Sequence, residues 1–129
     1  MTDFETIMSP ANFRTGAPYS PALRAGTLLF VSGHVPLNPA DGTTVGSDTA
    51  SQTRQVLENL QRTIEAGGSS LNRVAKTTVF LTYITDFEEM NRVYREFFHD
   101  PLPARSTVEV SALARPDFRV EIEAIVLVE

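Results

Sequence analysis

An arginine and a glutamate near the end of the chain could carry chemistry. Arg105 lies near the start of the strand-like segment 104–111, and Glu121 near the start of the segment 119–128. If the two segments form a hairpin, both side chains can lie near each other on one face. Such a pair can be a plain salt bridge, worth about 0–1 kcal/mol when exposed. Alternatively, the guanidinium holds an anionic substrate while the carboxylate handles a proton or a water molecule.

Strand alternation divides the side chains of both segments between two faces of a sheet. We expect two sets to pack under helices: Val120, Ile122, Ala124, Val126 and Val128, and Ser106, Val108 and Val110. The opposite face then begins polar and becomes apolar: Arg105, Thr107, Glu109, Glu121, Glu123, Ile125 and Leu127. That face is either solvated, with scattered ion pairs, or buried against other subunits with a polar pocket at one end. Its two apolar residues favour the second interpretation, because exposed apolar patches mark interfaces.

The elements that must position these residues form one predicted domain over residues 1–129. Residues 4–25 are loop-rich and allow only a short strand. Helical spacing of apolar residues predicts helices at 49–66 and 86–99, and β-branched or apolar runs predict strands at 27–32, 73–82, 104–111 and 119–128. The order β-β-α-β-α-β-β indicates an α+β fold, with one sheet and two helices on one face.

Composition excludes several classes of function. Lys and Arg total 11 against 16 Asp and Glu, a net charge of -5, which argues against a general nucleic-acid binder. The absence of Cys excludes disulfide scaffolds, thiolate nucleophiles and iron–sulfur clusters. His34 and His99 are too few for a multi-histidine metal centre. No targeting segment or membrane-spanning run is visible, so we expect a cytoplasmic protein without membrane partners.

An ordered set of motifs over residues 18–126 resembles the RidA/YjgF/UK114 family of reactive-intermediate deaminases, also called L-PSP endoribonucleases. The motifs are PYS (18–20), LFVSG (29–33), QVLENL (55–60), KTTVFL (76–81), PARSTVEV (103–110) and VEIEAI (120–125). Each block alone is weak, and the resemblance depends on their order. It implies a chorismate-mutase-like unit with a mixed sheet, three of which close a barrel as a homotrimer with sites at the subunit interfaces.

The resemblance also implies an activity: hydrolysis of reactive 2-imino and 2-enamino acids to 2-keto acids and ammonia, without metal or cofactor, in metabolite damage control. Arg105 would clamp the substrate carboxylate, and Glu121 would orient or activate the attacking water. Further substrate-binding positions would be Tyr19, Ser32, Gly33, Asn91 and Thr107.

Some positions depart from the family pattern. Thr107 stands where many members have Cys, Pro21 replaces a frequent Gln, and His34 stands where Gln is frequent. We expect His34 in a loop or at the rim of the pocket rather than acting as a general base. The connection 112–118 is about one residue longer than the family pattern leads us to expect.

Three other functions remain open from the sequence. The first is a non-catalytic trimer that binds small carboxylates or acts like a chaperone. The second is an endoribonuclease, against which the acidic net charge and the lack of a histidine pair weigh. Chorismate mutase activity would rest on fold analogy alone.

Overall fold

The computed structural model describes residues 3–11 and 16–128. The strands are β1 (Phe4–Ile7), β2 (Ala22–Ala25), β3 (Leu28–His34), β4 (Val74–Leu81), β5 (Ala104–Glu109) and β6 (Val120–Leu127). The helices are α1 (Thr49–Ala66) and α2 (Phe87–Phe97), and short 3-10 turns at Leu71–Arg73 and Ile84–Asp86 lead into β4 and α2. Among the described residues, no helix is both long and apolar enough to cross a membrane.

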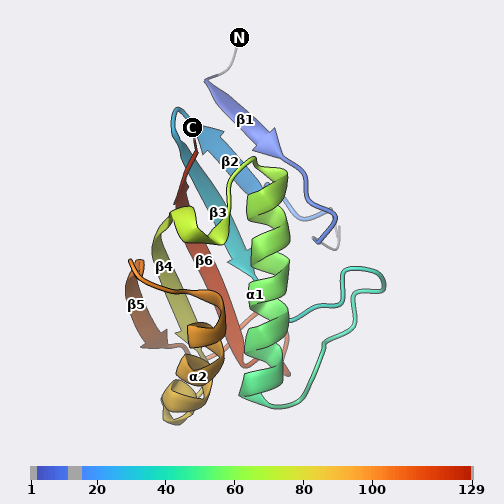
Figure 1. Cartoon of the computed structure of the whole chain (residues 1–129). Helices are drawn as coiled ribbons and strands as arrows, with labels where there is room; N and C mark the ends of the chain where they lie inside the picture. Colours follow the sequence, from blue (N-terminus) through green and yellow to red (C-terminus); the bar gives the residue numbers. More distant parts are fainter. Residues whose placement is uncertain (1–2, 12–15, 129) are drawn as a thin grey trace.

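The six strands form one mixed sheet in the order β1-β2-β3-β6-β4-β5. All neighbouring pairs are antiparallel except β4 and β5, which are parallel. Figure 1 shows α1 and α2 on the same face of this sheet. The predicted α+β class is therefore confirmed, as are the bounds of α1. Three strands, not two, precede α1, because the loop-rich N-terminal part contains both β1 and β2, each only four residues long and too short for a clear alternating pattern.

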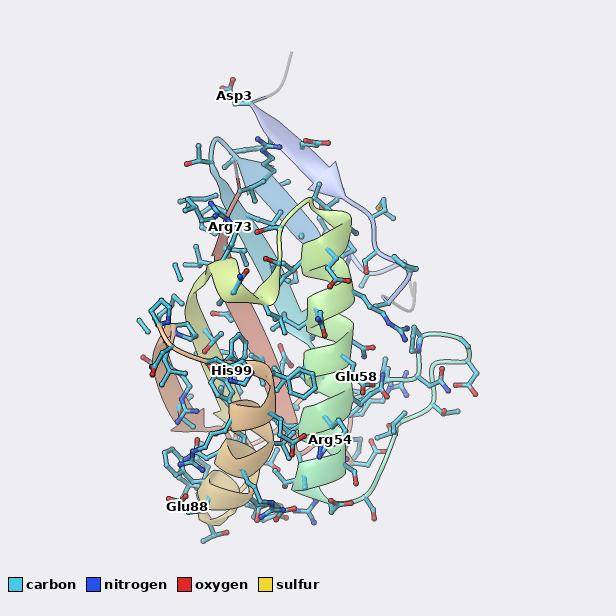
Figure 2. The ribbon with its side chains drawn as sticks, in the orientation of Figure 1. Asp3, Arg54, Glu58, Arg73, Glu88 and His99 are labelled. Atoms are coloured by element: carbon cyan, nitrogen blue, oxygen red, sulfur yellow. The ribbon has the colours of Figure 1, made fainter. Side chains whose placement is uncertain are left out.

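The core lies between α1 and the inner face of β6. The apolar residues of α1 that recur at helical spacing are all buried: Val56, Leu57, Leu60 and Ile64. They join one cluster with the side chains of β6 predicted to pack under helices: Val120, Ile122, Ala124, Val126 and Val128. Helix α2 joins α1 at their outer surface, where Arg54 (Figure 2) forms an ion pair with Glu96 at 3.0 Å.

The expected hairpin of the last two strands is wrong. Strand β5 pairs with β4, and β6 lies between β3 and β4. Arg105 is opposite Thr77, a buried residue on the helix-covered side, so Arg105 lies on that side too. Val108, expected under the helices, is 43% exposed on the other side. Alternation sorts side chains into two sets, but it does not say which set the helices cover.

The face of the sheet opposite the helices is rich in apolar side chains. Phe30, Val108 and Leu127 are each about two-fifths exposed there (42%, 43% and 43%), and Ile125 is half-buried beside them. The placement of Ile125 and Leu127 on the uncovered face agrees with the sequence analysis. Because β5 adds its apolar set to this face, the face is more apolar than the sequence predicted.

A buried glutamine of α1 ties two distant loops together. The side-chain amide of Gln52 donates to the carbonyls of Gly46 (3.1 Å) and Asp117 (2.9 Å). Its side-chain oxygen accepts from the backbone N–H of Arg119 at 2.7 Å. Gln52 is fully buried, so all three bonds are shielded from water. The side chain therefore holds both the connection before α1 and the turn that leads into β6.

Replacing Gln52 with Ala should destabilise the protein by about 2–3 kcal/mol, because buried backbone groups lose their partners. Urea denaturation followed by circular dichroism measures the change. The matched control is Gln61→Ala on the same helix, outside this network, which should stay within about 0.5 kcal/mol of the wild type. Equal effects of both substitutions would contradict the role of Gln52.

Candidate active site

Glu121 lies in a cavity of about 480 Å³ at the end of β3 and the start of β6. The sequence-predicted residues Tyr19, Ser32 and Gly33 line the same cavity. Tyr19 is largely exposed at its mouth, whereas Ser32 and Gly33 are half-buried. The structure therefore brings together four of the predicted site residues, from β3, β6 and the segment before β2.

The carboxylate of Glu121 lies directly against the backbone of Gly33. A Cβ atom at position 33 would overlap Glu121 Oε2 and lie only 2.8 Å from Glu121 Cδ. The side chain of any other residue would therefore push the carboxylate away. The strand pairing of β3 with β6 is irregular at this point, with a register shift between Val31 and His34.

Burial raises the pKa of the Glu121 carboxyl above its ordinary value, and the negative charge of Glu123 adds to the increase. No ion pair of Glu121 with a described cation lies within 4.0 Å. The carboxyl group is thus harder to ionise than a solvated glutamate. A carboxyl group with a raised pKa holds a proton more readily than a solvated glutamate, which suits a group that must accept a proton and return it.

His34, expected in a loop or at the rim of the pocket, is not in a loop: it is the last residue of β3, lines the Glu121 cavity and is only 3% exposed. Its Nδ1 is 2.7 Å from the Ser32 carbonyl, which can only accept, so Nδ1 carries the proton. Burial lowers the pKa of His34 and favours the neutral ring. Nε2 then accepts from the Thr63 hydroxyl at 2.8 Å. Both ring nitrogen atoms are therefore hydrogen-bonded, and the bond to the Ser32 carbonyl helps to hold the backbone next to Gly33.

Arg105 is held by the side chains of α2. Its Cζ lies 4.8 Å from the ring centroid of Tyr94 and 5.5 Å from that of Phe87. Nη1 is 3.9 Å from the sulfur of Met90, a weak acceptor. No described carboxylate pairs with the guanidinium. Aromatic faces thus position a cation whose hydrogen-bonding capacity for an anion is unused.

Asn91 and Thr107 lie on the same side of the sheet as Arg105. Asn91 is buried and lines a second cavity, of about 250 Å³, together with Arg105. Thr107 is two residues after Arg105 on the same face of β5. Its hydroxyl is buried and has no hydrogen-bond partner among the described residues. The second group of predicted site residues is therefore also assembled by the fold.

The two groups are not brought together within one chain. Glu121 is opposite Phe80 on β4, whereas Arg105 is opposite Thr77, so strand β4 separates them and they point to opposite faces. The expectation that Arg105 and Glu121 share a face is wrong, because it assumed a hairpin that does not form. Each chain therefore carries two separate groups of predicted site residues, one with a carboxylate and one with a guanidinium that pairs with no described carboxylate.

The site residues predicted from the sequence leave out two charged residues of the Glu121 cavity, Arg115 and Glu123. Arg115, in the connection between β5 and β6, lines that cavity. For Arg115, the signal in the sequence is the extra length of this connection, to which the sequence analysis assigns no role.

The geometry defines an α+β protein whose site residues are divided between two surfaces of one chain. A family model described as Endoribonuclease L-PSP matches residues 9–128. A RutC family protein from Pyrococcus horikoshii is 51% identical over 108 residues, which cover 84% of this chain and 85% of the relative. The chain therefore belongs to the RidA/YjgF/L-PSP family, as the sequence motifs indicated.

Two further relatives bear on function. The 2-iminobutanoate/2-iminopropanoate deaminase of Mus musculus is 41% identical over 108 residues, which cover 84% of this chain and 79% of that protein. The crystal structure of E. coli TdcF with bound serine matches with a TM-score of 0.88 at 34% identity, covering 97% of this chain and 99% of that chain. The six-stranded sheet with two helices is thus the fold of this family.

Replacing Glu121 with Gln should raise the melting temperature at pH 7 to 8. Because the pKa of Glu121 is raised in the folded chain, ionising it there costs folding free energy that an amide does not incur. The gain should shrink as pH falls through the raised pKa of the folded chain, and it should vanish below the ordinary pKa of glutamate, where the wild-type carboxyl is neutral in both the folded and the unfolded chain. Thermal unfolding from pH 4 to 8 measures it, with Glu58→Gln on the exposed surface of α1 (Figure 2) as the control. A gain that does not vary with pH would contradict this origin.

Proposed function

We propose that this chain hydrolyses reactive 2-imino and 2-enamino acids to 2-keto acids and ammonia, at a site that two copies of the chain complete. The observation that carries the proposal is the division into half-sites: an unpaired guanidinium in one and a carboxyl of raised pKa in the other. A relative at 41% identity bears the name of a 2-iminobutanoate/2-iminopropanoate deaminase, which supports this reaction class.

Arg105 binds the substrate carboxylate in this proposal. A guanidinium matches a carboxylate with two parallel hydrogen bonds. The stacking of Arg105 on Tyr94 and Phe87 fixes its plane before the substrate arrives. Asn91, and Thr107 with its unpartnered hydroxyl, are the further polar groups of the same half-site.

Glu121 handles the water. The substrate nitrogen is protonated, and Glu121 accepts a proton from the water as its oxygen adds to the carbon of the C=N bond, which forms a tetrahedral carbinolamine. Glu121 returns this proton to the nitrogen, so that the C–N bond breaks and ammonia leaves. The hydroxyl proton passes to Glu121 as the C=O bond forms and is then taken up by the released ammonia. Water is consumed and no oxidant or reductant is required. The raised pKa of Glu121 suits both steps, because the group must take up and release a proton in one cycle.

The uncovered sheet face supplies the surface on which copies associate. Phe30, Val108 and Leu127 on that face bury apolar area when another chain covers it. The family resemblance suggests a homotrimer, in which each of three equivalent interfaces joins the Arg105 half-site of one chain to the Glu121 half-site of its neighbour.

A second candidate function is small-carboxylate binding without turnover. The E. coli TdcF structure contains serine, an amino acid rather than an imine, which favours a site able to hold stable ligands. The two candidates differ in one measurement, since only the deaminase accelerates release of keto acid.

Arg105→Ala and Glu121→Gln should each lower kcat/KM by about 100-fold or more, since each removes one half of the site. The assay measures hydrolysis of 2-iminobutanoate generated in situ by an amino-acid oxidase. Refolding the two inactive variants together should restore activity. Random mixing leaves about a quarter of the interfaces with both Arg105 and Glu121 intact.

Each variant refolded alone is the control for that mixture. If the mixture stays as inactive as the separate variants, the two residues do not act across an interface. Full activity of Arg105→Ala alone, or no acceleration by the wild type, would remove the deaminase assignment.

Glu123→Gln should shift the acidic limb of the pH–rate profile to lower pH by up to about one unit. Glu121 acts as a base only when ionised, so activity falls as pH drops through its pKa. The charge of Glu123 raises that pKa, and its removal therefore lowers it. The control, Glu58→Gln, removes an equal charge from the outer surface of α1 and should leave the limb in place. A shift to higher pH would contradict the assigned role of Glu121.

A further inference from the structure

An arginine that the sequence analysis did not select lines the cavity of Glu121. Arg115 comes from the connection between β5 and β6 and is half-buried in the cavity wall. Its Nη1 donates to the carbonyl of Gly42 at 2.8 Å. Its Cζ lies 5.6 Å from the ring centroid of Phe118. These two contacts, with the connection before α1 and with the turn that leads into β6, hold the guanidinium in place.

Within residues 3–11 and 16–128, Arg115 forms no ion pair. Other arginines of the chain do: Arg54 pairs with Glu96 at 3.0 Å, and Arg119 pairs with Asp86 at 3.3 Å. A guanidinium has five N–H donors, and the bond to Gly42 uses one of them. The remaining capacity suits a carboxylate, which a guanidinium can bind through two hydrogen bonds.

The position of Arg115 in the cavity wall places it near the side chain of the proposed substrate. In the proposed function, Arg105 of a neighbouring chain takes the α-carboxylate, and Glu121 acts at the C=N carbon. The substrate side chain then extends into the cavity of about 480 Å³ around Glu121. Arg115 is part of the wall of that space. A second carboxylate at the end of the side chain would meet this guanidinium.

An acidic substrate side chain would bind in this cavity only if a cation offsets the negative charges that line it. Glu121 and Glu123 both line the cavity and would repel a second negative group. Among the described lining residues, Arg115 supplies the positive charge, since burial favours the neutral form of His34. Arg115 is therefore the residue of this cavity whose charge can offset a second carboxylate.

We propose that Arg115 is a specificity-determining residue that binds a side-chain carboxylate, so that 2-imino acids with a second carboxylate are the preferred substrates. This inference rests on the proposed deaminase function for the placement of the substrate. The binding of an acidic ligand at Arg115 can nevertheless be measured without any turnover.

Calorimetric titration with 2-oxoglutarate and 2-oxobutanoate, the keto acids of the acidic and neutral substrate classes, tests the site directly. The wild type should bind 2-oxoglutarate at least about tenfold more tightly. Arg115→Gln, which removes the positive charge, should lose about that factor for 2-oxoglutarate and stay within about twofold for 2-oxobutanoate. Arg115→Lys should retain part of the preference, because it keeps the charge but not the planar fork.

The control variant is Arg62→Gln, which makes the same change of charge on the exposed side of α1. It should leave both affinities unchanged. Equal affinity of the wild type for the two keto acids overturns the proposal. So does an equal loss for both ligands in Arg115→Gln, which would mean that Arg115 only fastens the loops.

Turnover separates this inference from the proposed function. With 2-iminoglutarate and 2-iminobutanoate generated in situ, Arg115→Gln should lower kcat/KM by about tenfold or more for the acidic substrate alone. Binding of 2-oxoglutarate that depends on Arg115, without hydrolysis of either imine, would support the anion site and refute the deaminase. Hydrolysis of both imines at equal kcat/KM by the wild type would support the deaminase and overturn the role of Arg115.

Discussion

The C-terminal strand β6 pairs with β3 on one side and with β4 on the other, and the rest of the structure depends on this insertion. It brings the inner face of β6 under α1, where the core forms. It also places the Glu121 carboxylate against Gly33 of β3, where only glycine leaves room. On its other side it puts β4 between Glu121 and Arg105. The position of this one strand thus fixes where both groups of predicted site residues lie and keeps them apart within a chain.

The arginines show how differently one residue type is used in this fold. Arg54 and Arg119 form ion pairs that link α1 to α2 and β6 to the turn before α2. Arg105 and Arg115 contact aromatic rings, as Arg119 also does at Tyr83, but they lie without a described carboxylate partner. An ion pair would satisfy a half-buried guanidinium in the free chain, whereas an aromatic support fixes it and leaves its donors for another molecule. The proposed substrate contacts both unpaired arginines.

The uncovered face of the sheet bears on both the stability of the assembled protein and the proposed imine site. A sheet with helices on one side leaves its other side to solvent, and here that side bears Phe30, Val108 and Leu127. Association through it would bury apolar area and also bring half-sites of different chains together. Stability and activity would then depend on the same contact, so that the imine site exists only in the assembled protein.

The sequence alone determined the local features of this protein. Apolar spacing defined α1 and the buried face of β6, and the ordered motifs indicated the family and the candidate residues, including Arg105 and Glu121. These features depend on residues close along the chain, so their periodicity is visible in the sequence.

The tertiary structure decided which strands pair and which faces are covered. Pairing depends on backbone hydrogen bonds between distant segments, and every residue type except proline can form these bonds. The alternation of side chains along a strand therefore could not show that β5 pairs with β4. For the same reason the sequence could not show the separation of Arg105 from Glu121, the burial of His34 or the entry of Arg115 into the cavity. Each of these is set by packing between elements rather than by spacing within one.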